Sequence, residues 1–383
     1  MGREVSPATF EEAASALADA GAEGHTVRVR GGGTKLGWGE ITPAPDLELH
    51  TSALNQIIEH NVGDLTAVLQ AGVPLARASE AFGEHRQMLA LDPPWAGGPD
   101  ASAQATIGGL IAAGDSGPLR HRYGAARDLV VGMTVALSNG TIARSGGKVI
   151  KNVAGYDLAK LFAGSFGTLG VILSVSVRLH PLPDSTTTAL GTSGDPDVLA
   201  CAACALSAAP LELEALDVAW RSGRGGILAR AGGAESARRA RRIALLIAEA
   251  GLEQVDVVSD DDALWARQRA GQRSRAKALV RITARPSSLA NVLRATDACG
   301  GTLVGRAAVA SYFVELDPEA VGRLREQLPS GARSVLLDAP DAALAATSRW
   351  GSGDGAALAL MKRVKAQFDP TGTFNPGVFV GGI

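Results

Sequence analysis

Apolar residues recur along this chain with two spacings, and the two spacings predict a mixture of strands and helices. Alternation with a period of two, or a short continuous apolar run, is typical of a strand, whereas apolar residues three and four apart are typical of an amphipathic helix. The strands predicted in this way cover residues 27–30, 47–50, 66–70, 129–137, 141–144, 169–179, 213–220, 278–283 and 308–316. The predicted helices cover residues 7–20, 54–59, 74–85, 156–162, 236–250, 289–298 and 356–368.

Turn-forming and capping residues mark the ends of several of these elements. Ser6 is the expected N-cap of the first helix, Pro7 suits the first helical position, and Gly21 can close the helix. Asn139-Gly140 lies between two apolar segments and predicts a tight hairpin turn. The interleaving of strands and helices predicts the α+β class.

The length of the chain predicts more than one domain, because 383 residues exceed what a single ordinary core holds. Asp92-Pro93-Pro94 interrupts the first part of the chain, and the breaker-rich segment 180–185 is the expected main boundary. We therefore expect one domain over residues 1–185, with subdomains at about 1–90 and 91–185, and a second α+β domain over 186–345. Residues 346–383 are expected to form a final helix and a turn-dense tail that returns to the first domain.

Composition excludes several classes of protein. Hydrophobic residues make up 46% of the chain and charged residues 20%, which is typical of a globular protein. The formal net charge of −2 does not indicate the excess of basic residues that nucleic-acid-binding proteins usually carry. No apolar run is long enough for a transmembrane segment, and the polar start of the chain lacks the apolar core of a signal peptide.

Three cysteines are too few for a disulfide framework, which fits a reducing compartment. Cys201 and Cys204 lie in an alanine-rich segment that predicts a buried helix, in which cysteine acts as a small apolar residue. An iron–sulfur cluster normally needs four thiolates, and this chain has three cysteines.

Three glycine-rich loops, each next to an apolar strand, are the most informative motifs. The first is Arg30-Gly-Gly-Gly-Thr-Lys, the second follows Thr106-Ile-Gly-Gly, and the third is Gly164-Ser-Phe-Gly-Thr-Leu-Gly. Small residues at this density let the backbone lie directly against a flat or phosphorylated ligand. Their combination indicates one large cofactor held mainly by backbone atoms.

Two common nucleotide-binding motifs fit poorly. Gly31 and Gly33 match the first two glycines of the dinucleotide fingerprint, but the third position is Leu36. The phosphate-binding loop with its Gly-Lys-Ser/Thr ending also fails, because Val149 follows Gly147-Lys148.

Taken together, the motifs resemble another family. The three loops, Tyr123-Gly, Lys151-Asn-Val-Ala-Gly-Tyr-Asp-Leu and Phe374-Asn-Pro-Gly are similar to flavoproteins of the vanillyl-alcohol oxidase/p-cresol methylhydroxylase type. Within that group the chain most resembles the FAD-binding subunits of glycolate oxidase, the smaller of two flavin subunits, and Lys148-Val-Ile-Lys-Asn-Val-Ala-Gly-Tyr-Asp is specific to this branch. The resemblance covers residues 25–185 and the tail from about 355.

The resemblance implies a fold and a cofactor. The fold is the two-subdomain, PCMH-type FAD-binding fold in residues 1–185, followed by an α+β cap domain in 186–345. The first loop is expected to hold the pyrophosphate of FAD with successive amides, and the N-terminal amides of the helix after Thr106 are expected to add to the same field. The residues expected to contact FAD are Gly31, Gly32, Gly33, Thr34, Lys35, Thr106, Ile107, Gly108, Gly109, Ser116, Gly117, Tyr123, Gly124, Gly167, Gly170, Val171, Ile172 and Asn375. The charges of Lys35 and Arg120 fit either a ligand contact or a solvated surface.

The distribution of histidines departs from that of the relatives that oxidise hydroxy acids, which use a histidine cluster in the cap domain for a metal and for the hydroxyl proton. All six histidines of this chain lie at or before residue 180. We therefore expect no metal and assign no catalytic residue. No histidine lies in the first loop, so FAD is expected to be bound noncovalently.

The function implied by the resemblance is that of an FAD-binding subunit in a glycolate (2-hydroxy acid) oxidase complex. Its implied partners are a larger catalytic flavin subunit and an iron–sulfur subunit, and its implied location is the cytoplasm, with contact to the inner face of the membrane only through partners. One alternative is a self-sufficient FAD-dependent 2-hydroxy acid dehydrogenase, in which Arg285 or Arg306 binds a carboxylate. Another is a structural subunit with a vestigial flavin site.

Overall fold

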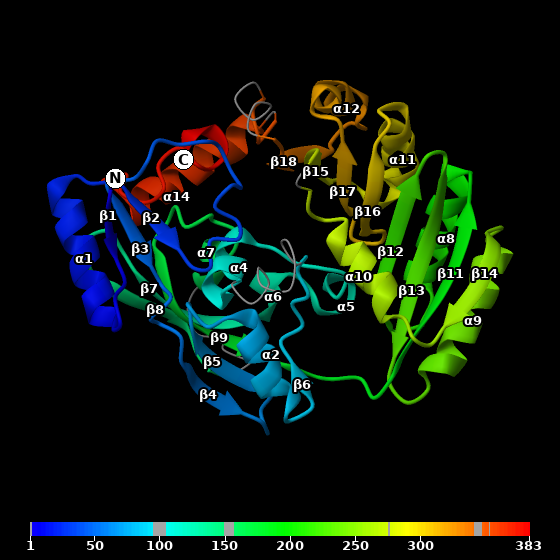
Figure 1. Ribbon diagram of the computed structural model, residues 1–383, viewed down its shortest axis with the longest axis horizontal. Helices are drawn as coiled ribbons and strands as arrows, with labels where there is room; N and C mark the ends of the chain where they lie inside the picture. Colours follow the sequence, from blue (N-terminus) through cyan, green and yellow to red (C-terminus); the bar gives the residue numbers. More distant parts are fainter. Residues whose placement is uncertain (1, 95–104, 149–156, 275, 341–346, 352) are drawn as a thin grey trace.

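The structure, a computed structural model, describes residues 2–94, 105–148, 157–274, 276–340, 347–351 and 353–383. Its elements form two lobes (Figure 1). The first lobe holds the strands between Arg3 and Pro181 together with the last helix, and the second lobe holds one large sheet between Thr186 and Asp338. The predicted domain boundaries themselves stay a prediction.

A small parallel sheet opens the first lobe. Its strand order is β1 (Arg3–Val5), β3 (Leu47–His50) and β2 (Val27–Arg30), and helix α1 (Phe10–Glu23) connects β1 to β2. Leu17 of α1, Val27 and Leu49 are fully buried in one apolar cluster, so the helix packs on the sheet through its apolar face. The first glycine loop leaves this sheet at the end of β2.

An antiparallel sheet of five strands forms the centre of the first lobe. The order is β4 (Ile57–Asn61), β5 (Thr66–Gln70), β9 (Val171–Arg178), β7 (Val130–Ala136) and β8 (Ile142–Gly146). The helices of this part of the lobe are α2 (Leu75–Gly83), α4 (Ile107–Ala113), α5 (Arg120–Tyr123), α6 (Ala126–Leu129) and α7 (Ala159–Phe162). A separate two-stranded antiparallel sheet is formed by β6 (Gln87–Met88) and β10 (His180–Pro181).

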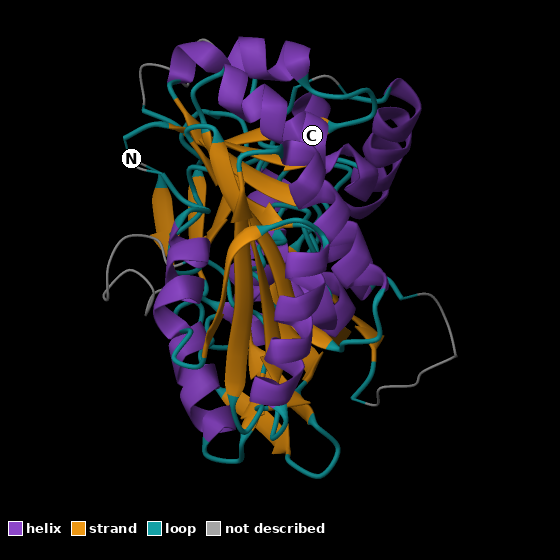
Figure 2. Ribbon diagram, turned by 90° about the vertical axis from the view of Figure 1, so that its right-hand side faces the viewer, coloured by secondary structure: helices purple, strands orange, loops and turns teal. Residues whose placement is uncertain are grey.

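The second lobe is an antiparallel sheet of eight strands with helices on both faces. The strand order is β14 (Glu253–Val258), β11 (Thr186–Ser193), β13 (Arg224–Gly232), β12 (Leu213–Arg221), β16 (Thr302–Arg306), β17 (Ser311–Leu316), β15 (Ala278–Thr283) and β18 (Arg333–Asp338). The outer face carries α8 (Pro196–Ala208), α9 (Ser236–Glu249), α11 (Leu289–Ala298) and α12 (Val321–Gln327), as Figures 1 and 2 show. Helix α10 (Asp262–Ala270) lies on the face turned toward the first lobe.

Side-chain alternation divides the two faces of this large sheet. Leu216 and Val218 of β12 point into the apolar core under the outer helices, whereas Asp217 between them points toward the first lobe. The inner face therefore carries the polar groups that face the cofactor-binding motifs.

Most predicted strands are confirmed within a few residues, and the hairpin turn is confirmed by Gly140, whose φ is 78° between β7 and β8. The predicted helix at 54–59 is wrong: residues Ile57–Asn61 form strand β4, because they pair with β5. Six residues are too few for helical and strand spacing to be told apart. Strands β11, β13, β14, β16 and β18 were not predicted at all.

Two local predictions are also corrected. Helix α1 begins at Phe10, because the Thr9 hydroxyl accepts from the Glu12 amide at 3.1 Å while Glu12 accepts from the Ala8 amide, and it ends at Gly24 rather than Gly21. Cys201 and Cys204 lie in helix α8 as expected, but both are exposed, because this helix packs through Leu199, Ala202, Ala203 and Leu206 instead.

The last helix, α14 (Gly355–Phe368), ends in a clamp on the first lobe. The ammonium of Lys365 donates to the carbonyls of Thr168 and Phe374 at 2.7 and 2.8 Å and pairs with Asp369 at 2.6 Å. The Asp369 side chain is fully buried and also accepts from the amides of Thr373 and Phe374. This clamp holds the tail, including Asn375, against the third glycine loop.

Lys365→Met is expected to destabilise the protein by about 3 kcal/mol, because it leaves the buried Asp369 carboxylate without its cation. Lys362→Met, on the exposed side of the same helix, is the matched control and is expected to change stability by less than about 0.5 kcal/mol. Thermal and urea unfolding measure both changes. Equal stability of the two variants would contradict the clamp.

Candidate functional site

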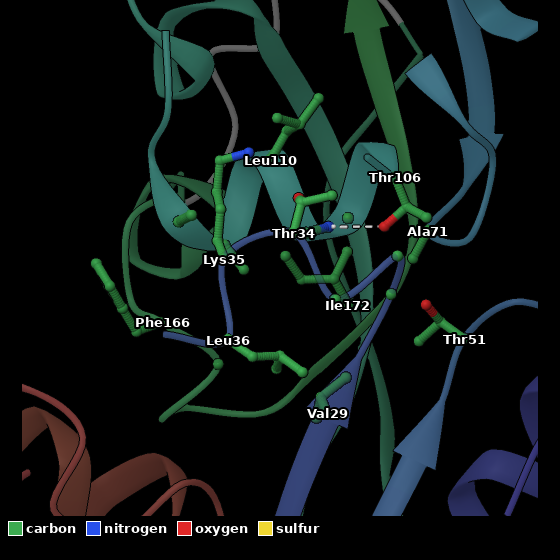
Figure 3. A pocket seen from close by; sticks show the side chains of 18 of the residues that line it. Val29, Thr34, Lys35, Leu36, Thr51, Ala71, Thr106, Leu110, Phe166 and Ile172 are labelled. Carbon is green, nitrogen blue, oxygen red and sulfur yellow. Dashed lines mark hydrogen bonds between the residues drawn. The ribbon is translucent and has the colours of Figure 1, made fainter. Parts of the chain in front are cut away.

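The three glycine loops and the tail meet around one cavity in the first lobe (Figure 3). The predicted residues that line it are Gly31, Gly32, Gly33, Thr34, Lys35, Thr106, Gly108, Gly109, Gly167, Gly170, Ile172 and Asn375. Further lining residues, which were not among the predicted contacts, are Arg28, Val29, Leu36, Trp38, Thr51, Ala71, Leu110, Ala112, Ala113, Phe166 and Val378. Some of them, such as Phe166 and Leu36, lie in or next to the glycine loops, whereas chain folding alone brings Thr51, Ala71 and Val378 to the cavity.

The first loop supplies a row of unpaired backbone donors. Within the described part of the chain, no group accepts a hydrogen bond from the amides of residues 31–35. The loop lies close against α4, because a Cβ added at Gly31 would meet the Thr106 hydroxyl at 2.1 Å. Successive amides without acceptors form a nest that suits an anion such as a pyrophosphate.

The first amides of helix α4 have partners within the protein. The amides of Ile107 and Gly108 donate to the carbonyls of Val73 and Ala71 at 2.9 and 2.8 Å, the second of which is drawn in Figure 3. The Thr106 hydroxyl caps Gly109 at 3.4 Å. These amides already donate within the protein, and their expected contribution to the field of the first loop stays a prediction.

The third loop and the tail form the opposite rim. The side-chain amide of Asn375 donates to the carbonyl of Phe166 at 2.8 Å, and both residues have positive φ angles of 41° and 56°. Gly167 lies so close that an added Cβ would be 2.9 Å from Nδ2 of Asn375. The loop therefore needs glycine at this position to hold the tail against the cavity.

Other predicted contacts lie elsewhere. The side chains of Ile107 and Val171 are fully buried in apolar clusters. Ser116, Gly117 and Gly124 lie outside the lining of this cavity, and Tyr123 lines a different groove, where its hydroxyl donates to Glu214 at 2.6 Å. The role of all these residues toward the cofactor stays a prediction. Of the branch-specific motif at 148–157, residues 149–156 lie outside the described residues.

The charge of Lys35 is already paired. Its ammonium lies 3.1 Å from the carboxylate of Asp115, and the two side chains are only 9% and 2% exposed. Of the two alternatives for Lys35, the solvated surface charge is therefore wrong. Burial and the nearby Arg306 lower the pKa of Arg120, which lies at the boundary between the lobes.

Several charged residues lie where the inner face of the large sheet meets the first lobe. Arg306 forms a two-pronged pair with Asp217 at 3.1 and 3.0 Å, and both side chains are almost completely buried. Arg306 is thus occupied, and Arg285, the other arginine considered for a carboxylate, is exposed. Arg281 of β15 has no hydrogen-bond or ion-pair partner among the described residues, and burial lowers its pKa while Asp115 opposes the shift.

Asp92 lies at the same boundary. Its carboxylate accepts from the Leu119 amide at 3.1 Å, and burial raises its pKa to about 7 against the opposing charges of Arg269 and Arg306. The carboxylate therefore exchanges its proton near neutral pH. Sequence reasoning missed both Arg281 and Asp92, because neither belongs to a recognisable motif.

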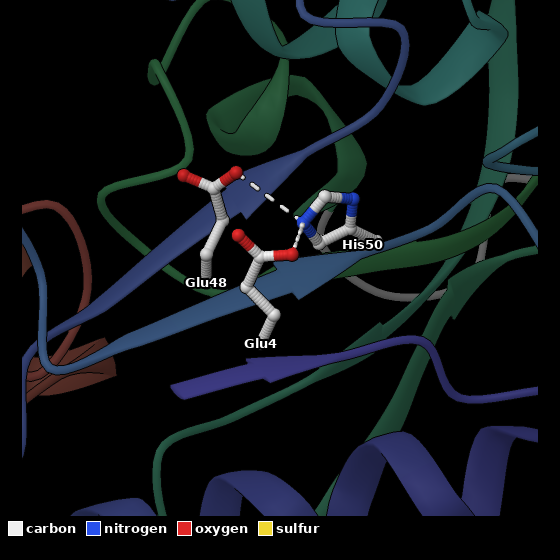
Figure 4. A group of neighbouring side chains, drawn as sticks. All are labelled: Glu4, Glu48 and His50. Carbon is white, nitrogen blue, oxygen red and sulfur yellow. Dashed lines mark ion pairs between the residues drawn. The ribbon is translucent and has the colours of Figure 1, made fainter. Parts of the chain in front are cut away.

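A second charged group lies on the small parallel sheet (Figure 4). Nε2 of His50 is 3.3 Å from Glu48 and 3.7 Å from Glu4. The Glu48 carboxylate is already paired with Arg28 and with Arg30, the latter at 2.9 Å. Two guanidinium groups neutralise this carboxylate, so the group is an ion-pair cluster and we assign no metal to it.

Comparison with known families identifies the cavity. Residues 3–146 match the model of the family described as FAD binding domain. The chain carries a FAD-binding domain. The first loop, Ala71, Thr106 and the residues of α4 around the cavity all lie within this domain, and the third loop and tail lie outside the matched segment.

Several proteins are similar to this chain. It is 39% identical over 194 residues to the glycolate oxidase subunit GlcD of Bacillus subtilis, covering 49% of this chain and 39% of that protein. It is 39% identical over 127 residues to the glycolate oxidase subunit GlcE of Escherichia coli, covering 33% and 35%. The chain thus spans well under half the length of these two relatives. An uncharacterized FAD-linked oxidoreductase of Mycobacterium tuberculosis is 25% identical over 98% of this chain and 90% of that protein.

The fold is shared with a solved structure. Alkyldihydroxyacetonephosphate synthase superposes with a TM-score of 0.70 over 97% of this chain and 76% of its own, at 14% identity. This likeness shows that the FAD-binding domain and the large sheet together form the fold expected from the sequence. In the described part of the chain, no helix is both long enough and apolar enough to cross a bilayer.

The residues around the cavity fit FAD. The unpaired amides of the first loop suit its pyrophosphate, and the close approach of Gly31 to Thr106 leaves the backbone free to touch a ligand. The cavity also has apolar walls from Leu110, Ala113 and Phe166, which suit a flat ring system.

Gly31→Ala is expected to weaken FAD binding at least roughly tenfold, because the new methyl group displaces Thr106 or the loop itself. Gly63→Ala is the matched control, since a Cβ at that position meets no atom within 4 Å. Titration of the flavin-free protein with FAD, followed by flavin fluorescence, measures both dissociation constants. Unchanged FAD affinity in Gly31→Ala would place the pyrophosphate elsewhere.

Proposed function

We propose that this protein is the FAD-binding subunit of a glycolate (2-hydroxy acid) oxidase complex. As an FAD-dependent oxidoreductase acting on CH–OH groups, the complex oxidises glycolate to glyoxylate and passes the electrons through flavin to an iron–sulfur subunit. The relatives in B. subtilis and E. coli are glycolate oxidase subunits, which supports a 2-hydroxy acid substrate and a multi-subunit assembly. D-lactate dehydrogenase of Archaeoglobus fulgidus, 33% identical over 198 residues, supports the 2-hydroxy acid class.

The observation that carries an accessory role is the wall between the FAD cavity and the large sheet. All described lining residues come from residues 28–172 and from Asn375 and Val378. Trp38, which is 2% exposed, stands between this cavity and Leu279, Phe313 and Leu337 of the large sheet. On this side of the cavity, packed apolar side chains therefore separate the large sheet from the cofactor site.

The missing histidines support the same role. Oxidation of a 2-hydroxy acid removes the hydroxyl proton, and a positioned base typically contributes roughly 10²–10⁴-fold to such a step. Residues 181–383 contain no histidine to act as this base. We therefore assign the main catalytic step to the larger partner subunit, and we propose that this chain binds FAD noncovalently and works in the cytoplasm.

In anaerobic mixing with excess glycolate, the flavin of the isolated FAD-loaded chain is expected to bleach far more slowly than that of the whole complex. Dithionite is expected to bleach it fully, because a small reductant needs neither a base nor a docked substrate. Flavin absorbance measures both reactions. Bleaching by glycolate at the rate of the complex would overturn the accessory role, and a chain that cannot be loaded with FAD would point to a vestigial site.

The charged residues where the two lobes meet favour a second candidate, a self-sufficient FAD-dependent dehydrogenase. Arg281 offers an unpaired guanidinium for the substrate carboxylate, and Asp92 offers a carboxylate that is half ionised near pH 7. In this candidate Asp92 would accept the hydroxyl proton of the substrate, and FAD held by the first glycine loop would supply the oxidising power. Trp38 would have to move to connect these residues with the cavity.

Under this second candidate, the rate of flavin reduction by glycolate is expected to rise as the pH rises through about 7, because only the ionised Asp92 accepts a proton. Asp92→Asn keeps an oxygen for the Leu119 amide but cannot accept the proton, so it is expected to abolish this rise. Stopped-flow reduction between pH 5.5 and roughly 8.5 covers the titration. The same pH profile in both proteins would exclude Asp92 as the base.

A further inference from the structure

Residues of the second lobe hold the first glycine loop from the outside. The indole N–H of Trp38 donates to Oδ1 of Asp338, at the end of β18, at 3.0 Å. Asp338 also accepts from the guanidinium of Arg273 at 2.9 and 3.3 Å and from the amide of Ser274 at 3.2 Å. The Asp338 side chain is 11% exposed, so these bonds are largely shielded from water.

Arg273 reaches further into the loop. Its Nη1 donates to the carbonyl of Thr34 at 3.2 Å, and its guanidinium lies 5.3 Å from the centre of the Trp38 ring. Thr34 lines the FAD cavity, and its amide is one of the unpaired donors. Arg273 of the second lobe thus binds the carbonyl oxygen of Thr34, a residue that lines the cofactor cavity.

The far end of the loop is tied in the same way. The guanidinium of Arg349, which is 2% exposed, bonds to the carbonyls of Gly37 and Leu337, and its amide donates to Glu40 at 2.9 Å. The loop is therefore held at Thr34 and Trp38 by the second lobe, and at Gly37 and Glu40 by Arg349 of the segment that follows the large sheet. Its own hydrogen bonds within residues 33–38 are two turn contacts, at 3.4 and 3.0 Å.

We propose that Asp338 and Arg273 are positioning residues for the first glycine loop, so that tight FAD binding requires the second lobe to be docked. A nest binds an anion well only if its amides converge before the ligand arrives, because ordering the loop on binding costs conformational entropy. The second lobe supplies this order through charge-assisted hydrogen bonds. The proposal concerns cofactor retention and goes beyond the proposed function, since it holds for any substrate.

If Asp338 only stabilised the fold, its loss would affect FAD binding no more than an equal loss of stability elsewhere. The chain contains a second tryptophan–aspartate pair that serves as the control. Trp220 donates to Oδ1 of Asp297 at 3.0 Å, and Asp297 also accepts from the Gly223 amide at 2.9 Å. This second tryptophan–aspartate pair lies within the second lobe and joins β12 to α11, away from the FAD cavity. Asp297→Ala removes a tryptophan–aspartate hydrogen bond, without a guanidinium pair, and does not touch the loop.

The experiment compares FAD dissociation constants of flavin-free full-length protein by calorimetric titration. Asp338→Ala is expected to weaken FAD binding at least roughly tenfold, because the loss of the charge-assisted contacts loosens the loop. Asp338→Asn, which keeps an oxygen for the Trp38 N–H but loses the pair with Arg273, is expected to have an intermediate effect. Asp297→Ala is expected to lower the thermal midpoint while leaving the FAD dissociation constant within twofold of that of the wild type.

Trp38→Phe keeps the bulk of the ring and removes its hydrogen bond, and it completes a double-mutant cycle with Asp338→Ala. The effects of the two substitutions on FAD affinity are expected to be less than additive, because both break the same bond. FAD affinity of Asp338→Ala within twofold of that of the wild type would overturn the proposal. So would equal losses of affinity in Asp338→Ala and Asp297→Ala, because these would reflect lower stability alone.

Discussion

The unpaired amides of the first glycine loop are the constraint on which the rest of this structure depends. Five successive backbone donors face a cavity and find no acceptor within the described protein. The loop residues are half-exposed, so water can accept from these amides, and a bound anion would satisfy several of them at once. Three contacts position the segments around these amides. Thr106 lies against Gly31, Lys365 binds the tail to the third loop, and Arg273 of the second lobe binds the first loop.

The two lobes meet in two different ways. At Trp38 the contact is closely packed: the ring lies against Leu279, Phe313 and Leu337, and its N–H donates to Asp338. Along Asp92, Arg281 and the Asp217–Arg306 pair it is charged and only partly satisfied. The closely packed part suits permanent retention of a cofactor, whereas unpaired charges suit a contact with something outside the chain. The two kinds of contact therefore support different functions. The close packing around Trp38 favours an accessory flavin subunit, and the unpaired charges favour a self-sufficient dehydrogenase.

Local signals predicted the first lobe better than the second. The strand at 27–30, the Asn139-Gly140 turn and the glycine loops each carry their information within a few residues, and the structure has them where they were expected. The strands of the large sheet at 186–193 and 224–232 contain several glycines and threonines rather than a clear alternation, so they escaped prediction. Among the described residues, strand β11 pairs only with strands far along the chain, which no short window reports. Strand β13 also pairs with β12 across the two-residue turn Ser222-Gly223, a local hairpin signal that sequence reasoning missed.

The sequence by itself determined that a large cofactor is held by backbone atoms and that no histidine follows residue 180, because glycine patterns and residue types are properties of the chain alone. Only the tertiary structure decided which groups remain free to act. Arg306 is neutralised by Asp217, Lys35 by Asp115 and the first amides of α4 by carbonyls of the neighbouring segment, while Arg281 and the loop amides stay unpaired. Whether a charge or a donor is satisfied depends on which distant segment lies within about 3 Å of it, and that is fixed by packing.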